Sequence, residues 1–157
     1  MTQTTLPWTG LLATAEQLGA FVWVEAKVSS ILGAWVATEP DPFRKVELNA
    51  RSSQHRWQSE LLFERLPVLA VVTPEDLVRP PDLQFELFLD LIASTEPGQD
   101  QLVAMQQVLL PYLLEVYQQE LRSLSEISDA SARKTLTVVI ANLRSELLLT
   151  STALDPG

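Results

Sequence analysis

The sequence predicts an all-α protein, because long stretches have helical periodicity and the strongest turn signals fall between them. Only the run VLAVV at residues 68–72 has the composition of a strand. The chain has 157 residues, of which 46% are hydrophobic, so it is large enough for one domain with a sizeable core. We therefore expect a single domain over residues 1–157, with its core between about 12 and 150 and short flexible termini.

The composition argues against several classes of partner. The formal net charge is −9, whereas nucleic-acid binding uses clustered lysine and arginine, so we expect neither a nucleic acid nor an anionic membrane surface as a partner. The chain contains no cysteine, and therefore no disulfide framework and no thiolate metal site. The apolar run LPVLAVV is far shorter than a bilayer span, and the segment MTQTTLPWTG lacks the pattern of a secretory signal. These features predict a soluble cytoplasmic protein.

The first two predicted helices are separated by the turn sequence TEPDP. One helix covers about residues 14–38. The next begins at Asp41 and Pro42, a pair favoured at the N-cap and at the first helical position. It ends near Leu66, because Pro67 follows. A connection this short predicts an antiparallel pair of helices.

The second pair of predicted helices lies in the C-terminal half. One covers about residues 99–124 and contains Pro111, which removes a backbone donor and crowds the preceding turn, so we expect a kink there. The other follows the sequence SDAS and extends to about Thr150. The long connection between the two pairs, about residues 67–98, is rich in proline and carries one helix-like stretch, LQFELFLDLI. Together these elements predict an antiparallel four-helix bundle, made of two helical hairpins joined by a long crossover.

A carboxylate lies in the middle of the buried stripe of the first helix. At about 100° per residue, Glu25 falls among apolar residues of this stripe: Leu18, Phe21, Val22, Val28, Leu32 and Val36. Burying an ionised carboxylate costs several kcal/mol unless the group is paired or bound to a metal. Glu25 therefore needs a partner.

The only histidine of the chain, His55, lies on the apolar inner face of the second helix. That face reads Leu48, Ser52, His55, Ser59, Leu62 and Leu66, so one serine precedes the ring by a turn and another follows it. If the first two helices pair across residue 40, Glu25 and His55 come level, because each is fifteen positions from that turn. Three interpretations stay open: a buried hydrogen-bonded pair, a metal or substrate site that includes the pair, or a second helix rotated so that the two never meet.

This order of helices, with an inward glutamate on the first and an inward histidine on the second, resembles the ferritin-like four-helix bundles. The segments WVEAK and HRWQSELLFERLP also look like a group of uncharacterised bacterial proteins with this predicted fold. In the ferritin-like superfamily, helices one and three each supply a carboxylate and helices two and four each supply Glu-x-x-His, which together hold two metal ions.

The resemblance implies that the first half of such a dinuclear site is incomplete. Glu25 and His55 match the family pattern, but Ser52 stands where the second helix should carry glutamate. Ser52 or Ser59 beside the histidine could be read as a nucleophile, yet the chain has no G-x-S-x-G turn and no third group to orient the base.

The second half of the site is also incomplete. The inward face of the third helix ends in Tyr117, and an acid, Glu120, reaches that face only toward the end of the helix. The fourth helix has no histidine and carries Glu146 on the flank of its inner face. We therefore expect no dinuclear cofactor. The alternative is a single divalent metal held by Glu25 and His55, with Glu120 or Glu146 as a third ligand.

The first two helices carry a second apolar face, away from the Glu25–His55 pair. The residues of this face are Phe43, Val46, Ala50, Trp57 and Leu61 on the second helix, and Val24, Ile31 and Trp35 on the first. Such a face must be covered. Either the crossover or the N-terminal segment LPWTGLL lies over it, or it is the interface of a homodimer through these two helices or of a complex with another protein. Tryptophan is enriched in interface cores.

Taken together, the residues favour a non-catalytic binding or interaction protein, built on a ferritin-like bundle without an intact dinuclear metal site. One alternative is an enzyme or metal-binding protein with a reduced mononuclear site at Glu25 and His55. Another is a bundle opened at Pro111 that binds a small molecule, with His55 as its polar contact. Neither the substrate nor the partner follows from the sequence.

Overall fold

The computed structural model describes residues 7–154, with side chains from residue 10 to residue 149, and most of this part of the chain is helical. No strand occurs within it, so the prediction of an all-α protein is confirmed and VLAVV is not a strand. Of the predicted flexible termini, residues 1–6 and 155–157 lie outside the described residues, whereas residues 7–11 belong to α1 and residues 151–154 to α7. The elements in chain order are α1 (Pro7–Thr38), α2 (Pro42–Phe63), α3 (Pro74–Leu77), α4 (Leu83–Ala93), α5 (Gln99–Val103), the π-helix η1 (Ala104–Leu109), α6 (Leu110–Ser123) and α7 (Ala130–Leu154).

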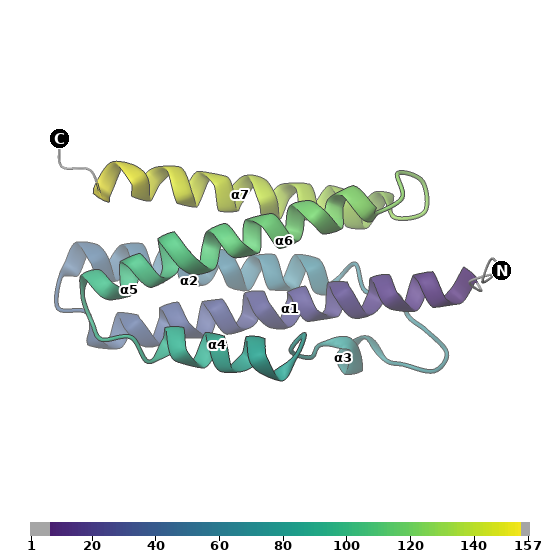
Figure 1. Cartoon of the computed structure of the whole chain (residues 1–157), viewed down its shortest axis with the longest axis horizontal. Helices are drawn as coiled ribbons and strands as arrows, with labels where there is room; N and C mark the ends of the chain where they lie inside the picture. Colours follow the sequence, from purple (N-terminus) through teal and green to yellow (C-terminus); the bar gives the residue numbers. More distant parts are fainter. Residues whose placement is uncertain (1–6, 155–157) are drawn as a thin grey trace.

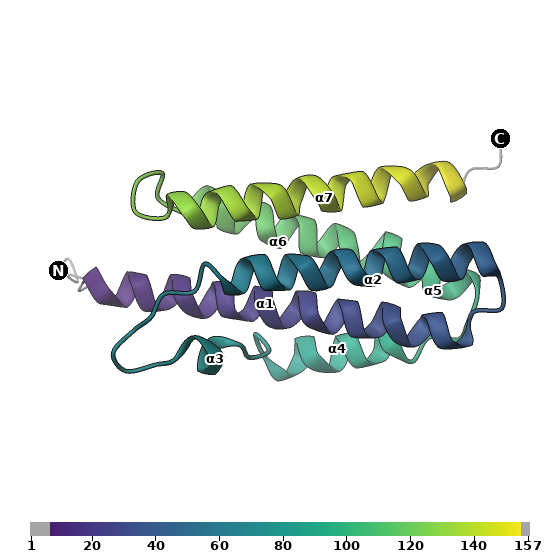
Figure 2. The same cartoon turned by 180° about the vertical axis from the view of Figure 1, so that it is seen from behind.

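The helices α1 and α2 lie side by side and run in opposite directions, as Figures 1 and 2 show. The start of α2 agrees with the prediction: Asp41 is the N-cap, and its carboxylate accepts a hydrogen bond from the backbone N–H of Phe43. In contrast, α1 begins earlier than predicted, at Pro7. From Pro7 onward, the segment LPWTGLL is therefore part of α1 and does not fold back over the outer face of the pair.

The crossover carries two helices rather than one. The predicted stretch forms α4, with Asp82 as its N-cap. Helical periodicity does not reveal α3, because this helix is a single turn, capped by the side chain of Thr73. The turn lies so close to α1 that a Cβ atom at Gly19 would come within 2.1 Å of the carbonyl oxygen of Leu77. The absence of a side chain at Gly19 thus lets the crossover pack directly on α1.

The segment from Gln99 to Ser123 is a continuous helical run in which the π-helix η1 directly precedes Pro111. The N–H of Leu110 donates to the carbonyl of Met105, which lies one residue further back than in an α-helix. Proline cannot donate, so the backbone widens into a π turn before it. The structure thus shows a π turn before Pro111, and the kink expected there stays a prediction. Before the run, Gly98 has a φ of 122°, a conformation that favours glycine.

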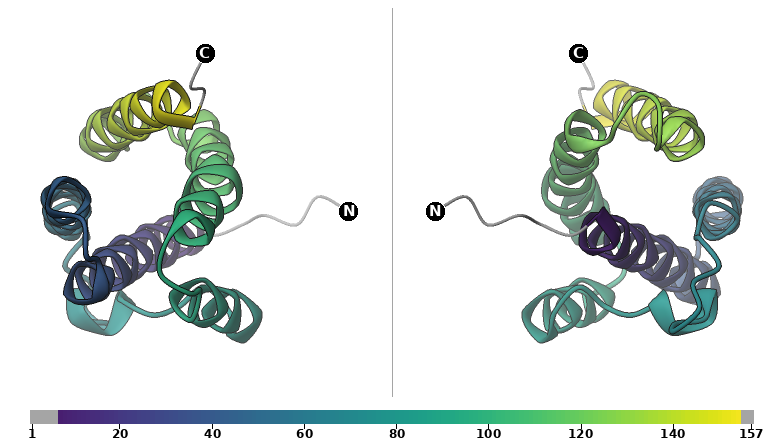
Figure 3. Two further views of the ribbon diagram at one scale, coloured as in Figure 1. Left: turned by 90° about the vertical axis from the view of Figure 1, so that its left-hand side faces the viewer. Right: turned by 90° about the vertical axis from the view of Figure 1, so that its right-hand side faces the viewer.

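The helices α6 and α7 form the second side-by-side pair, which lies along the α1–α2 pair in Figure 1. In the end views of Figure 3, α4 lies on the far side of α1 from α7. The core between these elements is apolar and almost fully buried, and it includes Val28, Leu62, Leu113, Leu136 and Leu143. This packing surrounds the polar residues described below.

The second apolar face of α1 is covered within the chain, whereas that of α2 is open. Trp35 of α1 is 4% exposed, and its ring Nε1 donates to the carbonyl oxygen of Ala93 at the end of α4. On α2, Phe43, Val46 and Trp57 are 87%, 71% and 45% exposed. The crossover therefore covers the apolar face of α1 and not that of α2, and the interface expected through both helices stays a prediction.

By length and composition, residues Gly10–Thr38 of α1 could cross a membrane, and this stretch lies near the N-terminus. Half of its most apolar window is buried inside the protein, which is also typical of a core helix. A search for unbroken apolar runs misses this stretch, because its apolar runs are short. They are separated by so few charged residues that the mean hydropathy of the window is still high.

Candidate functional site

Glu25 is fully buried on α1, and both of its carboxylate oxygens accept hydrogen bonds. Its Oε2 lies 2.6 Å from Nδ1 of His55 and accepts a second bond, at 3.0 Å, from Nε2 of Gln58. Its Oε1 accepts a bond of 2.7 Å from the hydroxyl of Tyr117. Side chains from α2 and α6 thus meet at one carboxylate of α1, which gives the buried charge the partners it requires.

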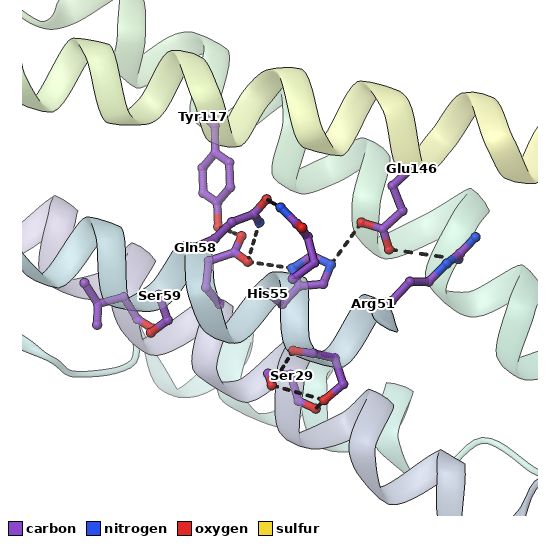
Figure 4. Close-up of polar contacts among 11 residues, drawn as sticks. Ser29, Arg51, His55, Gln58, Ser59, Tyr117 and Glu146 are labelled. Atoms are coloured by element: carbon purple, nitrogen blue, oxygen red, sulfur yellow. Dashed lines mark hydrogen bonds and ion pairs between the residues drawn. The ribbon is translucent and has the colours of Figure 1, made fainter. Parts of the chain in front are cut away.

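His55 lies between two carboxylates. Its Nδ1 faces Glu25, and its Nε2 lies 3.0 Å from Oε2 of Glu146 on α7. Figure 4 shows the ring of His55 and its contact with Glu146. Burial alone would lower the pKa of His55, but the charge of Glu25 and the hydrogen bonds to Glu146 and Glu25 outweigh burial and raise this pKa to about 10. His55 is therefore an imidazolium at neutral pH, and both of its ring nitrogens donate.

Glu146 connects the buried cluster to the surface. Its side chain is 10% exposed, and its Oε1 lies 3.9 Å from Nη1 of Arg51 on α2. The Nη2 of Arg51 in turn donates to Oε1 of Glu47 at 2.8 Å. The inner part of this arrangement, which we call the charge network, consists of Glu25, His55, Glu146 and Arg51. Within it two anions lie beside two cations, and Arg51 is shared with Glu47 at the outer end.

Tyr117 is completely buried on α6, with its ring centroid 4.6 Å from that of Phe21. Burial raises the pKa of Tyr117 well above its ordinary value, and the charge of Glu25 raises it further. The hydroxyl therefore stays protonated and serves as a donor to Glu25. Tyr117 links α6 to the charge network without adding a charge to it.

The two serines beside His55 point to the backbone of α1 rather than to the ring. The hydroxyl of Ser59 donates to the carbonyl of Val22 at 2.8 Å. Ser52 and Ser29 hydrogen-bond across the two helices, each to the other's carbonyl, at 2.8 and 2.7 Å. These bonds fasten α2 to α1 above and below the charge network. They also leave neither serine arranged with His55 as a nucleophile and its base.

Glu120 does not join the charge network. It lies in the last turn of α6, and within the described residues no hydrogen bond or ion pair connects its side chain to Glu25, His55 or Glu146. Burial and the charge of Asp129 raise the pKa of Glu120. Glu120 therefore lies at the end of the α6–α7 pair. Of the two candidate third ligands, Glu120 and Glu146, only Glu146 contacts His55.

Several polar residues of the interior were not predicted from the sequence, and three of them bear on the site. Arg51 belongs to the charge network and Gln58 adjoins it, and the signal for both is spacing: they lie four residues before and three residues after His55, on the same side of α2. Gln106 of η1 is 5% exposed, and its side-chain amide has no hydrogen-bond partner in the described part of the chain. No sequence signal singles out Gln106 from the other glutamines.

A groove between α2 and α7 opens over the outer end of the charge network. Its volume is about 300 Å³, and its lining includes Arg51, Gln54, Asn142 and Glu146. His55 is fully buried and does not line it. A small molecule in this groove would therefore contact Glu146 and Arg51, and not the histidine.

The donor set fits a metal poorly in this arrangement. Glu25, His55 and Glu146 are residue types that bind metals, but no group of three or more such residues in the described structure is placed to hold an ion. A ring nitrogen that donates a hydrogen bond has no free lone pair, so a metal would have to displace its proton and break that bond. The geometry favours a salt-bridged cluster.

Comparisons with models of protein families, with curated proteins and with solved structures found no match to the chain. The structure alone describes the chain as an all-α protein whose interior holds a network of two carboxylates, an imidazolium and a guanidinium.

Proposed function

We propose that the chain is a ferritin-like four-helix bundle in which the charge network takes the place of a dinuclear metal site, and that it works as a non-catalytic binding or interaction protein. On this proposal it is a cytoplasmic protein that needs no cofactor. Its formal net charge of −9 supports partners other than nucleic acids and anionic membranes.

The observation that carries this proposal is the double hydrogen bonding of His55. Both ring nitrogens lie within 3.0 Å of a carboxylate oxygen, so neither is free to act as a base or as a metal ligand. The positive charges of His55 and Arg51 compensate Glu25 and Glu146, so the cluster does not require a metal ion to be stable. A ring that is fully buried is also out of reach of a substrate.

The arrangement of the long helices supports the bundle. The pairs α1–α2 and α6–α7 are each joined by a short connection, and a long crossover with α3 and α4 joins the pairs. One long crossover is the connectivity of the ferritin-like folds. Glu25, His55, Tyr117 and Glu146 each come from a different helix of these pairs, as the metal ligands of that superfamily do.

Metal content tests this proposal directly. The protein, purified without chelator, is challenged with Fe(II), Mn(II) or Zn(II), and bound metal per chain is measured by mass spectrometry beside the Glu25→Ala and His55→Ala variants. We expect no stoichiometric metal in any of the three proteins. Glu120→Ala is the matched control, because this glutamate lies outside the charge network.

The competing function is a mononuclear metal site. The meeting of Glu146 with Glu25 and His55 favours it over a small-molecule site at His55, because the ring is buried and lines no groove. About one equivalent of metal, lost in Glu25→Ala and His55→Ala but kept in Glu120→Ala, would establish it and overturn our proposal. The imidazole signals of the single histidine would then shift on addition of zinc at constant pH, which a purely structural network would not show.

A further inference from the structure

The outer face of α2 carries an exposed row of residues with the spacing of a two-stranded coiled coil. Phe43, Val46, Ala50, Ser53 and Trp57 follow one another at alternating intervals of three and four positions, as a and d residues do in a heptad repeat. All five are exposed, and they lie on the side of α2 away from the buried His55. We call this row the outer stripe.

The charges of α2 run against its own helix dipole. Basic residues, Arg44 and Lys45, lie near the N-terminus, where the dipole favours acids, and an acid, Glu60, lies in the last turn, where the dipole favours bases. Among the described residues no ion pair involves any of these three side chains. Arg44 lines a cavity with Leu32 and Trp35 of α1, on the inner side of α2. The exposed Lys45 and Glu60 are complementary to a neighbouring helix that runs in the opposite direction and carries the same pattern.

We propose that this neighbour is a second copy of the chain, and that two α2 helices pair antiparallel through their outer stripes across a two-fold axis. The axis passes between Ala50 and Ser53, whose small side chains let the two backbones approach closely. Trp57 then packs on Val46 of the partner subunit, and Phe43 lies beside the stem of Glu60 of the partner subunit. This inference rests on the proposed interaction role and identifies its partner.

Charge decides between the antiparallel and the parallel arrangement. In a parallel pair, each Glu60 would face Glu60 of the partner subunit, and each basic N-terminal end would face another basic end, both of which are unfavourable. In the antiparallel pair, the end with Lys45 lies over the acidic C-terminal end of the partner helix. The two helix dipoles are then also aligned favourably.

Light scattering on a sizing column gives the first test. The full chain is expected to have a mass twice its 17.5 kDa at high concentration and to dissociate on dilution. Val46→Glu is expected to be monomeric at all concentrations and to keep its helical circular dichroism. The matched control is Leu87→Glu, since Leu87 is a similarly exposed apolar residue on α4. A monomeric natural chain, or a dimer that is lost in Leu87→Glu and kept in Val46→Glu, would overturn the inference.

Cross-linking gives the orientation, because the chain contains no cysteine of its own. In the antiparallel pair, Phe43→Cys and Glu60→Cys should form a disulfide only when the two variants are mixed. Each variant alone would place its cysteines about 25 Å apart, from a helical rise of about 1.5 Å per residue. Disulfides in the separate variants, with none specific to the mixture, would show a parallel pair and contradict the inference.

These results are separable from those of the metal experiment. A monomeric chain without bound metal would overturn the inference and leave the charge network's structural role intact. A dimer that binds one metal per chain would overturn the proposed function and leave the interface standing.

Discussion

The inner and outer faces of α2 reverse the usual relation between polarity and burial. The inner face buries His55 and Gln58, whereas the outer face exposes Phe43, Val46 and Trp57. The polar residues inside are held by partners from α1 and α7, and the apolar residues outside have no such cover within the described chain. Polar residues on this helix are therefore buried where hydrogen-bond partners are available, and the hydrophobic face stays exposed, which is why we propose it as an interface.

The largest effect should come from removing the cation inside the network. His55→Leu leaves Glu25 buried without its main partner, and we expect a loss of about 3–5 kcal/mol in the free energy of unfolding, measured by urea denaturation. The double variant Glu25→Leu/His55→Leu should recover part of this loss, because it leaves neither partner of the ion pair buried as an unpaired charge. A cost of less than about 1 kcal/mol for His55→Leu would mean that the inner face does not depend on the ion pair.

The pH dependence of stability should identify His55 as the charged partner. The pKa of His55 is raised to about 10 in the folded chain from an ordinary value of 6.5. The stabilisation is therefore complete below pH 6.5 and is lost as the pH rises toward 10, on the order of a few kcal/mol. Comparison with His55→Leu over this range isolates the effect of the imidazole. In NMR spectra of the folded protein, the single histidine should show no titration midpoint near its ordinary value.

A smaller loss is expected where a neutral donor is removed from the inner face. Tyr117→Phe deletes the hydroxyl that donates to Glu25, and a hydrogen bond to a charged group contributes about 1.5–3 kcal/mol to the free energy of unfolding. Tyr112→Phe is the matched control, because Tyr112 is half exposed and its hydroxyl has no partner among the described residues. Equal effects of the two substitutions would argue against the charge network as the source.

The smallest effects distinguish the two faces by a pair of serines. Ser59→Ala on the inner face removes the bond to the carbonyl of Val22 and should cost about 0.5–1.5 kcal/mol. Ser53→Ala on the outer face should change stability by no more than about 0.5 kcal/mol when the chain is monomeric, because Ser53 is exposed and alanine favours helices. Thermal unfolding at low protein concentration measures both. A larger cost for Ser53→Ala than for Ser59→Ala would contradict the comparison.

Much of the fold could be predicted from local signals. Asp41 and Pro42 mark the start of α2, and the apolar spacing around Leu89 marks α4. The single turn α3 could not be predicted, because four residues give no period to detect. The close approach of Leu77 to Gly19 is a contact between distant segments, which no local pattern encodes.

The candidate site could be predicted only in part for a related reason. Glu25 and His55 stand out because each is a charged or titratable residue on an apolar stripe, and the length of the hairpin brings them level. Glu120 and Glu146 look alike by the same criterion, since both lie near the edge of an inward face. Only the rotation of α6 and α7 about their axes separates them, and packing sets that rotation.

The amino-acid sequence was enough to predict that the protein is all-α, where α2 begins, and that the buried Glu25 needs a partner, with His55 as one candidate. These conclusions follow from periodicity, capping residues and the cost of burying a charge, all of which act locally or on a single residue. Tertiary packing was needed to show that α4 covers α1 and leaves α2 open, and that Glu146 and Arg51 complete the charge balance. Those outcomes depend on how helices distant in the chain pack against each other, because each interior charge is satisfied by side chains from several elements at once.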